Sequence, residues 1–243
     1  MSGAESTVMP GVRWGRSSSG RLDEESKVDH RAADRASTLV GQTADRVPTL
    51  LLKARDALRE ASRLGATRGA AEAGDPPARF VRNLTSLRRQ AEDATSTALG
   101  AAPDEADRRS VLTALYVRAD MGRIAVLIEQ VGDIFLGRGA RPFSAPVAAH
   151  VRELAAACPT LMAQAHDVLR SPGPPALLDQ GLADIADRQR HLSHALLTGG
   201  LDCPTRDAVD AAVLGRCYEE CAWRTVALTR VALHGPGAAP RRP

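Results

Sequence analysis

The chain has 243 residues with a formal net charge of +3 at pH 7, and only 3% of its residues are aromatic. This length supports a sizeable core, and the scarcity of aromatic residues makes that core aliphatic, which favours helix packing over a sheet sandwich. The charge is too small and scattered to predict a nucleic-acid partner, and no uncharged apolar run is long enough to predict membrane insertion.

Proline and glycine divide the first half of the chain into predicted helices. Residues 1–20 are rich in Ser and Gly without apolar periodicity, so we expect a flexible tail there. A first helix is predicted from Asp23 to Leu64, bent near Pro48 because proline has no N–H for a helix interior. A second helix is predicted over Pro77–Leu99, and a third ends near Leu136.

The second half repeats this scheme after a predicted boundary at Gly137–Pro142. Helices are predicted over Ser144–Arg170, Ala176–Thr198 and Thr205–His234, and a second flexible tail over residues 235–243. We therefore predict an all-α fold of two tandem three-helix bundles, related by a pseudo-two-fold axis and covering residues 21–138 and 143–234.

The third predicted helix has an apolar stripe at alternating steps of four and three residues: Val117, Met121, Ile124, Ile128, Val131 and Phe135. At 100° per residue Asp120 falls within the apolar arc, whereas Glu129 and Asp133 point away from it. The pair Glu129 and Asp133 has two interpretations: metal ligation together with other acids, or an ordinary solvated face.

The last predicted helix contains the most informative stretch, residues 208–231, which read AVDAAVLGRCYEECAWRTVALTRV. It resembles the last helix of PhoU-type regulators, typically written AVDxAxLGRxYExxADHAxxxAR. Trp223 and Arg224 stand where that pattern has Asp and His. The matching positions are Ala208, Val209, Asp210, Leu214, Gly215, Arg216, Tyr218 and Glu219.

Two other stretches extend the resemblance. The turn before the third helix is similar to the family's APxxxDLR, and counting on without a gap puts Asp120 and Arg123 on its acidic motif DLERxGD. In this alignment Gly122 and Val126 replace two metal-binding acids of the family. The sequence LIEQVGD at 127–133 could be aligned with the motif instead, but that alignment requires a seven-residue insertion before it. We therefore prefer the alignment without a gap. The other matching residues of the turn are Leu99, Ala102, Pro103, Asp107 and Arg109. The second stretch lies in the fifth predicted helix, where the matching residues are Asp187, Arg190, His191 and Leu192.

The resemblance implies a cytoplasmic regulator of phosphate homeostasis that restrains a phosphate transporter ATPase or a sensor histidine kinase by protein–protein contact. A homodimer is compatible with it. Carboxylate clusters hold iron or zinc in the family, and their remnant here is Asp187, Glu219 and Glu220, so we expect either no cofactor or one of these metals. The predicted partner-binding residues are Arg216, Tyr218, Trp223 and Arg224.

Other residue groups leave alternatives open. Cys217 and Cys221, one turn apart, could form a zinc site with His191 and His194, or the thiols could fill core volume. Trp223 is either an exposed anchor or packed against the first bundle. The first helix's arginines form either a phosphate or acidic-lipid surface or a salt-bridged face. Four cysteines without framework spacing predict a reduced, cytosolic chain.

No catalytic apparatus is recognisable in the sequence. GxSxG, P-loop, GxGxxG and HExxH motifs are lacking, and so are the Glu-x-x-His motifs of di-metal bundle oxidases. We therefore predict a protein that is not an enzyme. The alternatives to a phosphate regulator are a metal-binding helical bundle and a helical adaptor unrelated to phosphate.

Overall fold

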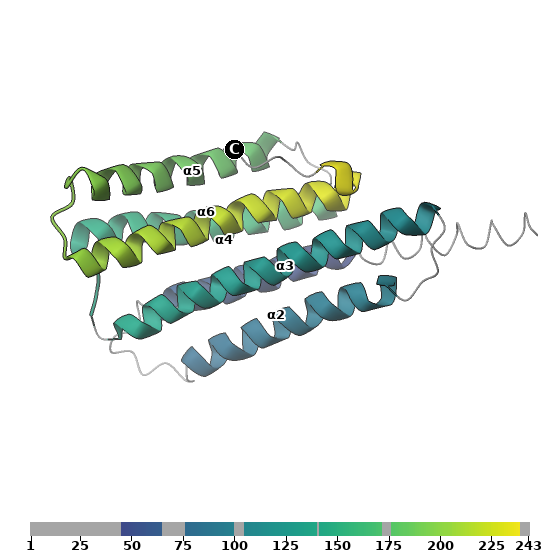
Figure 1. Ribbon diagram of the computed structural model, residues 1–243, viewed down its shortest axis with the longest axis horizontal. Helices are drawn as coiled ribbons and strands as arrows, with labels where there is room; N and C mark the ends of the chain where they lie inside the picture. Colours follow the sequence, from purple (N-terminus) through teal and green to yellow (C-terminus); the bar gives the residue numbers. More distant parts are fainter. Residues whose placement is uncertain (1–44, 65–75, 100–104, 140, 172–175, 239–243) are drawn as a thin grey trace, which may run out of the picture.

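The computed structural model is built of helices (Figure 1). It describes residues 45–64, 76–99, 105–139, 141–171 and 176–238. These ranges contain no strand, so the predicted all-α class is confirmed for them. None of the described helices combines the length and apolarity needed to cross a bilayer.

Residues 45–63 are helical, and further helices follow in chain order. These are α2 (Pro76–Leu99), α3 (Glu105–Arg138), α4 (Ala145–Arg170), α5 (Ala176–Leu197), α6 (Thr205–His234) and the short 3₁₀ helix η1 (Pro236–Ala238). The predicted bounds agree within two residues with those of α2, α4, α5 and α6, and the predicted end of the third helix agrees with that of α3. The predicted tail 1–20 and residues 23–44 of the first helix lie outside the described ranges, so the bend near Pro48 stays a prediction.

The C-terminal end of the fold differs from the sequence-based expectation. We predicted a flexible tail from residue 235, but residues 236–238 form η1, which packs against α6 and α3. Gly235 ends α6 with φ +85°, a left-handed conformation that glycine adopts at little cost, and its N–H donates to the Val231 carbonyl. Residues 239–243 of the predicted tail lie outside the described ranges.

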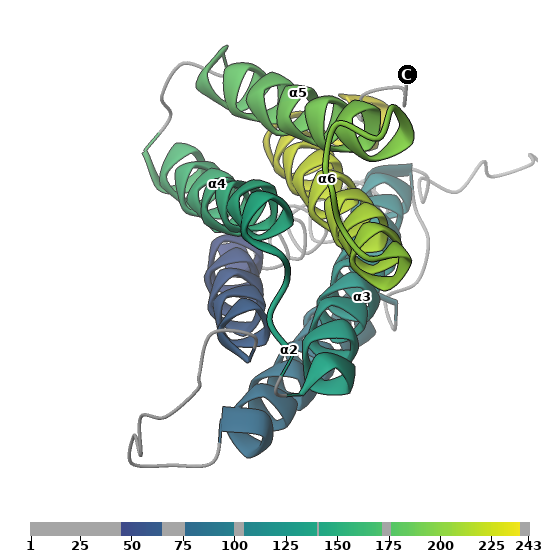
Figure 2. The same cartoon turned by 90° about the vertical axis from the view of Figure 1, so that its left-hand side faces the viewer.

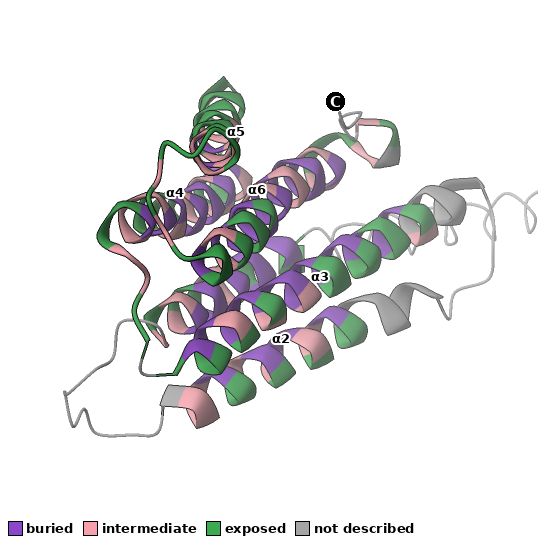
Figure 3. Cartoon of the chain, turned by 60° about the vertical axis from the view of Figure 1, so that its left-hand side comes forward, coloured by how far each residue is buried: buried purple, intermediate pink, exposed green. Residues whose placement is uncertain are grey.

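The core is aliphatic, as the composition predicts. Figure 3 shows that buried positions recur along each of the described α-helices. The predicted stripe of α3 is buried throughout, and Asp120 on the same arc is 9% exposed, so the helical register of this prediction is confirmed. One hydrophobic cluster contains side chains from residues 45–63 and from α2 to α6. The segment between α3 and α4 is therefore a linker, but the apolar core continues across it.

Helix α6 lies in the middle of the C-terminal half and packs against α3, α4 and α5 (Figure 2). Two glycines allow helices to approach closely. A Cβ on Gly132 of α3 would lie 2.5 Å from the Phe80 ring of α2. A Cβ on Gly215 of α6 would lie 3.2 Å from Leu192 of α5, which explains why the smallest residue stands in the middle of that helix.

Candidate functional site

The residues of α6 that match the family pattern mostly build the core. Leu214 and Tyr218 are fully buried, and the Tyr218 hydroxyl lies 2.8 Å from the Ser62 hydroxyl of the N-terminal helix. The Cys158 thiol of α4 donates to the Tyr218 carbonyl at 3.4 Å. Burial raises the pKa of the Tyr218 phenol well above its usual range. Tyr218 therefore joins the two halves of the chain through the interior.

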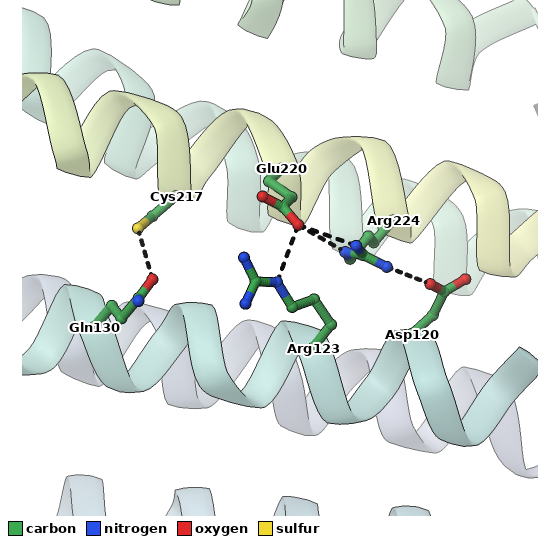
Figure 4. A network of polar contacts seen from close by, with 6 residues as sticks. All are labelled: Asp120, Arg123, Gln130, Cys217, Glu220 and Arg224. Carbon is green, nitrogen blue, oxygen red and sulfur yellow. Dashed lines mark hydrogen bonds and ion pairs between the residues drawn. The ribbon is translucent and has the colours of Figure 1, made fainter. Parts of the chain in front are cut away.

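Between α3 and α6 lies a line of charged side chains, Asp120, Arg123, Glu220 and Arg224, which we call the α3–α6 seam (Figure 4). One carboxylate oxygen of Glu220 accepts hydrogen bonds from Arg123 Nε at 3.1 Å and from Arg224 Nε and Nη2 at 3.1 and 3.0 Å. Arg224 also donates from Nη1 to Asp120 at 2.7 Å. Two guanidinium groups thus balance two carboxylates.

Burial and pairing compete in setting the charge states of the seam. Burial raises the pKa of Glu220, but the hydrogen bonds from Arg123 and Arg224 outweigh it, and the pKa lies below its ordinary value. For Asp120 burial is the larger effect, so its pKa is raised despite the hydrogen bond from Arg224. Glu220 is therefore the carboxylate that the seam holds firmly ionised.

A second charged cluster lies where α3 ends, and we call it the Arg138 junction. The Arg138 guanidinium is 5% exposed and donates to Asp207 and Asp210 of α6, both at 2.6 Å, and to the Pro142 carbonyl at 3.2 Å. Asp207 also accepts the Ser144 backbone N–H at 2.8 Å. Burial raises the pKa of Asp207, but the hydrogen bonds from Ser144 and Arg138 outweigh it and lower the pKa.

The predicted metal-binding acids are not brought together. Asp187 is exposed on α5 and pairs with Arg190, Glu219 pairs with Arg216, and Glu220 turns into the seam. Neighbouring residues on a helix point about 100° apart, which is why Glu219 and Glu220 face different surroundings. The described residues contain no group of three or more His, Cys, Asp and Glu side chains placed to hold a metal ion.

The other metal interpretations fail for similar reasons. Cys217 and Cys221 are buried in α6, whereas His191 and His194 are exposed on α5, so the Cys₂His₂ alternative does not form. Burial raises the pKa of the Cys217 thiol to about 11, and the thiol donates to Gln130 at 3.5 Å. The thiols of α6 therefore act as core side chains.

The second acidic pair is also explained by a neighbouring helix. Glu129 accepts a hydrogen bond from Arg88 of α2 at 2.6 Å, and Asp133 is exposed one turn further along α3. The solvated-face interpretation of the pair is thus the one that fits, with Glu129 serving as a cross-link between α2 and α3. Two described arginines of the first helix also form ordinary salt bridges on a solvated face: Arg55 contacts Asp56, and Arg63 contacts Glu60.

The four predicted partner-binding residues occupy three different environments. Arg216 is exposed and paired with Glu219, and Trp223 is half-buried with the Arg224 guanidinium 5.8 Å from its ring centroid. Arg224 belongs to the seam. Tyr218 is wholly buried on the core face of α6, so in this structure its side chain is part of the core and is not exposed to a partner.

Sequence reasoning missed the Arg138 junction. In the sequence, a single arginine at a predicted boundary resembles an ordinary helix C-terminal cation. The signal that could have found it was the spacing of Asp207 and Asp210, three residues apart at the start of an apolar helix, which puts two carboxylates on one face. No family model matches this chain, and no match was found among the curated proteins or the solved structures.

Proposed function

We propose that this protein is a PhoU-like, non-enzymatic regulator of phosphate uptake or phosphate-responsive signalling. It would act in the cytoplasm by contact with a transporter ATPase or a sensor histidine kinase, as a monomer or a homodimer. The helices would form two triplets, residues 45–63 with α2 and α3, and α4 with α5 and α6.

The observation that carries this proposal is the contact between α3 and α6 at the two stretches that resemble the family, although Glu220 and Arg224 themselves are not matching positions. Asp120 and Arg123 come from the stretch that resembles the family's acidic motif, and they face Glu220 and Arg224 of the last helix (Figure 4). The two stretches that resemble the family are separated by about a hundred residues in the chain but are in direct contact in the structure. This contact makes the resemblance a stronger argument for a common fold. The convergence supports a shared scaffold.

The same contact supports action without a metal. Arg224 stands where the family pattern has His, and its guanidinium lies between the carboxylates of Asp120 and Glu220. Together with Arg123, this fixed cation compensates both acids, so a metal ion is not needed to hold them together. A bundle of this kind would work by presenting helix faces whose affinity differs between two states of its partner.

Affinity capture from cells grown in low and in high phosphate tests the proposal. The bait is the full chain, and recovery of a phosphate-transporter component or a sensor kinase is the expected result. A bait carrying Arg216→Ala and Trp223→Ala is compared with one carrying Arg188→Ala and Arg190→Ala, which alters the outer surface of α5 instead. Loss of the captured protein with the first bait alone supports contact through α6.

Two outcomes would redirect the assignment. Capture of no transporter or kinase component in either condition favours a helical adaptor unrelated to phosphate. Stoichiometric iron or zinc in the purified protein, lost in a Glu219→Ala/Glu220→Ala variant, favours the metal-binding alternative. The second outcome would require these acids to rearrange, since each is paired with arginine in the structure.

A further inference from the structure

A pocket of about 480 Å³ lies at the end of the molecule where α3 stops and where α4 and α6 begin. Three of its lining residues are arginines, Arg138, Arg141 and Arg206, and the rest come from the linker 142–144 and the start of α6. Figure 2 looks onto this end, with the first turns of α4 and α6 near the end of α3. The pocket therefore combines a high density of guanidinium groups with two helix N-termini.

The helix N-termini contribute positive potential. The first N–H groups of a helix have no carbonyl partner within it, and together they act as about half a positive charge. Neither α4 nor α6 has a side-chain cap at its N-cap residue, Ser144 or Pro204. Asp207 receives one N–H, that of Ser144. Two helix ends that open on one pocket are suited to an anion.

Arg138 adds a buried positive charge to the pocket. Its side chain is 95% buried, since it is 5% exposed, and it lines the pocket. Both Nη atoms are engaged by carboxylates, but its Nε has no hydrogen-bond partner among the described residues. The Phe143 ring, 3.6 Å from the guanidinium carbon, covers one face of the group. Arg138 therefore contributes a fixed positive charge to the wall of the pocket, while its Nη donors are held by Asp207, Asp210 and the Pro142 carbonyl.

The local charges leave the pocket positive. The three arginines exceed the two carboxylates of Asp207 and Asp210, which are both bound to Arg138. Arg141 is exposed, and its side chain makes no hydrogen bond or ion pair with the described residues. Arg206 also lines the pocket and is 51% exposed, with its guanidinium 3.8 Å from Asp210. These two side chains can turn towards a common ligand.

The end of α3 does not cancel this potential. Its last carbonyls carry negative partial charge, but those nearest the pocket are already hydrogen-bonded. Gly139 donates to Leu136 at 3.0 Å, Arg206 donates to Gly137 at 3.1 Å, and the Arg141 N–H donates to Arg138 at 3.1 Å. The carboxylate of Asp207 also lines the pocket, but it is bound by Arg138 and by the Ser144 N–H.

We propose that this pocket binds a tetrahedral oxyanion, either free phosphate or a terminal phosphoryl group. Arg141 and Arg206 hold its oxygens at the mouth, and Arg138 and the first turns of α4 and α6 stabilise its charge from below. Guanidinium groups match such oxygens in geometry as well as charge. The binding site stands on geometry and charge, whereas its use as a phosphate signal rests on the proposed function.

Isothermal titration of the purified full chain at constant ionic strength tests the site. The probes are inorganic phosphate, phenyl phosphate and, for comparison, chloride. Saturable binding of a phosphate probe is expected, about tenfold weaker in Arg141→Gln and weaker still in Arg141→Gln/Arg206→Gln. Tighter binding of inorganic phosphate identifies the free ion as the ligand, and tighter binding of phenyl phosphate identifies a phosphoryl group. Both outcomes support the site.

A matched control separates a local site from general electrostatics. Arg152→Gln/Arg170→Gln removes the same charge from exposed positions of α4 and should leave binding unchanged. Equal weakening by both double variants, equal competition by chloride, or no binding of either phosphate probe overturns the proposal. Thermal unfolding confirms that the variants fold, and Arg141→Lys should recover part of the affinity. Because no cellular partner is involved, failure of the capture experiment would leave this result standing.

Discussion

Replacing Glu220 by glutamine should destabilise the fold much more than the same change at its neighbour Glu219. The Glu220 side chain is 8% exposed and accepts hydrogen bonds from Arg123 and Arg224. Glutamine keeps the shape and one carbonyl oxygen, but it removes the negative charge that compensates two guanidinium groups. Glu219 is 23% exposed and has a single partner three residues away on the same helix.

The magnitude follows from the burial of each partner. A hydrogen bond to a charged group contributes about 1.5–3 kcal/mol when it is shielded from water. Arg224, 20% exposed, falls in this range, although it keeps Asp120 as a partner. Arg123 is 44% exposed and can be rehydrated, so its contribution is reduced to about 0.5 kcal/mol. We expect a loss of about 2 kcal/mol for Glu220→Gln and about 0–0.5 kcal/mol for Glu219→Gln.

Urea unfolding at several pH values measures both the size and the origin of the effect. The folded pKa of Glu220 is below its ordinary value of 4.5, so its stabilisation is fully present above pH 4.5 and is lost as the pH falls through the folded pKa. Asp120 acts in the opposite direction, because its raised pKa makes protonation favour the folded state as the pH falls. The difference in the free energy of unfolding between the wild type and Glu220→Gln should therefore be largest near pH 7 and should decrease below pH 4.5.

Two results would refute this reasoning. Equal losses for the variants at 219 and 220 would mean that the seam does not stabilise the fold beyond an exposed pair. If the difference in the free energy of unfolding stays constant down to pH 3.5, the variant is destabilised by altered packing and not by the loss of the negative charge. A double-mutant cycle with Arg123→Gln should give a smaller coupling than one with Arg224→Gln, because Arg123 is the more exposed partner.

The remaining predictions concern the junction, the helix contacts and the thiols. Arg138→Met should cost about 3–5 kcal/mol in urea unfolding, because it leaves Asp207 as an uncompensated carboxylate in the interior. Gly132→Ala should lower the free energy of unfolding by about 1–3 kcal/mol through overpacking against α2, whereas Gly122→Ala, with open space around it, should raise it by about 0.5–1 kcal/mol. Alkylation at pH 8 followed by mass spectrometry should label Cys203 first, since burial raises the pKa of the other thiols, those of Cys158, Cys217 and Cys221.

Helix bounds could be predicted from the sequence because the signals that set them are local. Proline and glycine interrupt the chain between helices, and the spacing of apolar residues fixes which face of α3 is buried. Tyr218 shows that the same signals were available for α6. It lies on a stripe with Leu214, Cys221 and Thr225, all buried, so periodicity alone places it in the core. Its resemblance to a family position suggests a partner contact instead, and the burial of the side chain does not support that role.

The charged clusters could not be predicted in the same way, because they depend on which helices become neighbours. Glu219 and Glu220 are adjacent acids of the same helix, and the sequence does not show which of them is buried. Glu220 is the more buried one because it faces Arg123 of α3, whereas Glu219 pairs with Arg216 on α6 itself. Arg224 was assigned to a partner surface, yet it turns towards Asp120, more than a hundred residues away in the chain. Long-range pairing of this kind leaves no periodic signal in a single sequence.

The two clusters together determine how α3 and α6 align. Arg138 meets the start of α6 and Asp120 meets its later turns, so the helices run antiparallel and are cross-linked at two separate points. A slide of one turn, about 5.4 Å, would separate both sets of partners and leave several charges buried without compensation. The apolar core does not forbid such a slide, because Leu, Ile, Val and Ala offer similar surfaces at successive turns. The two charged clusters therefore fix the register of α3 against α6.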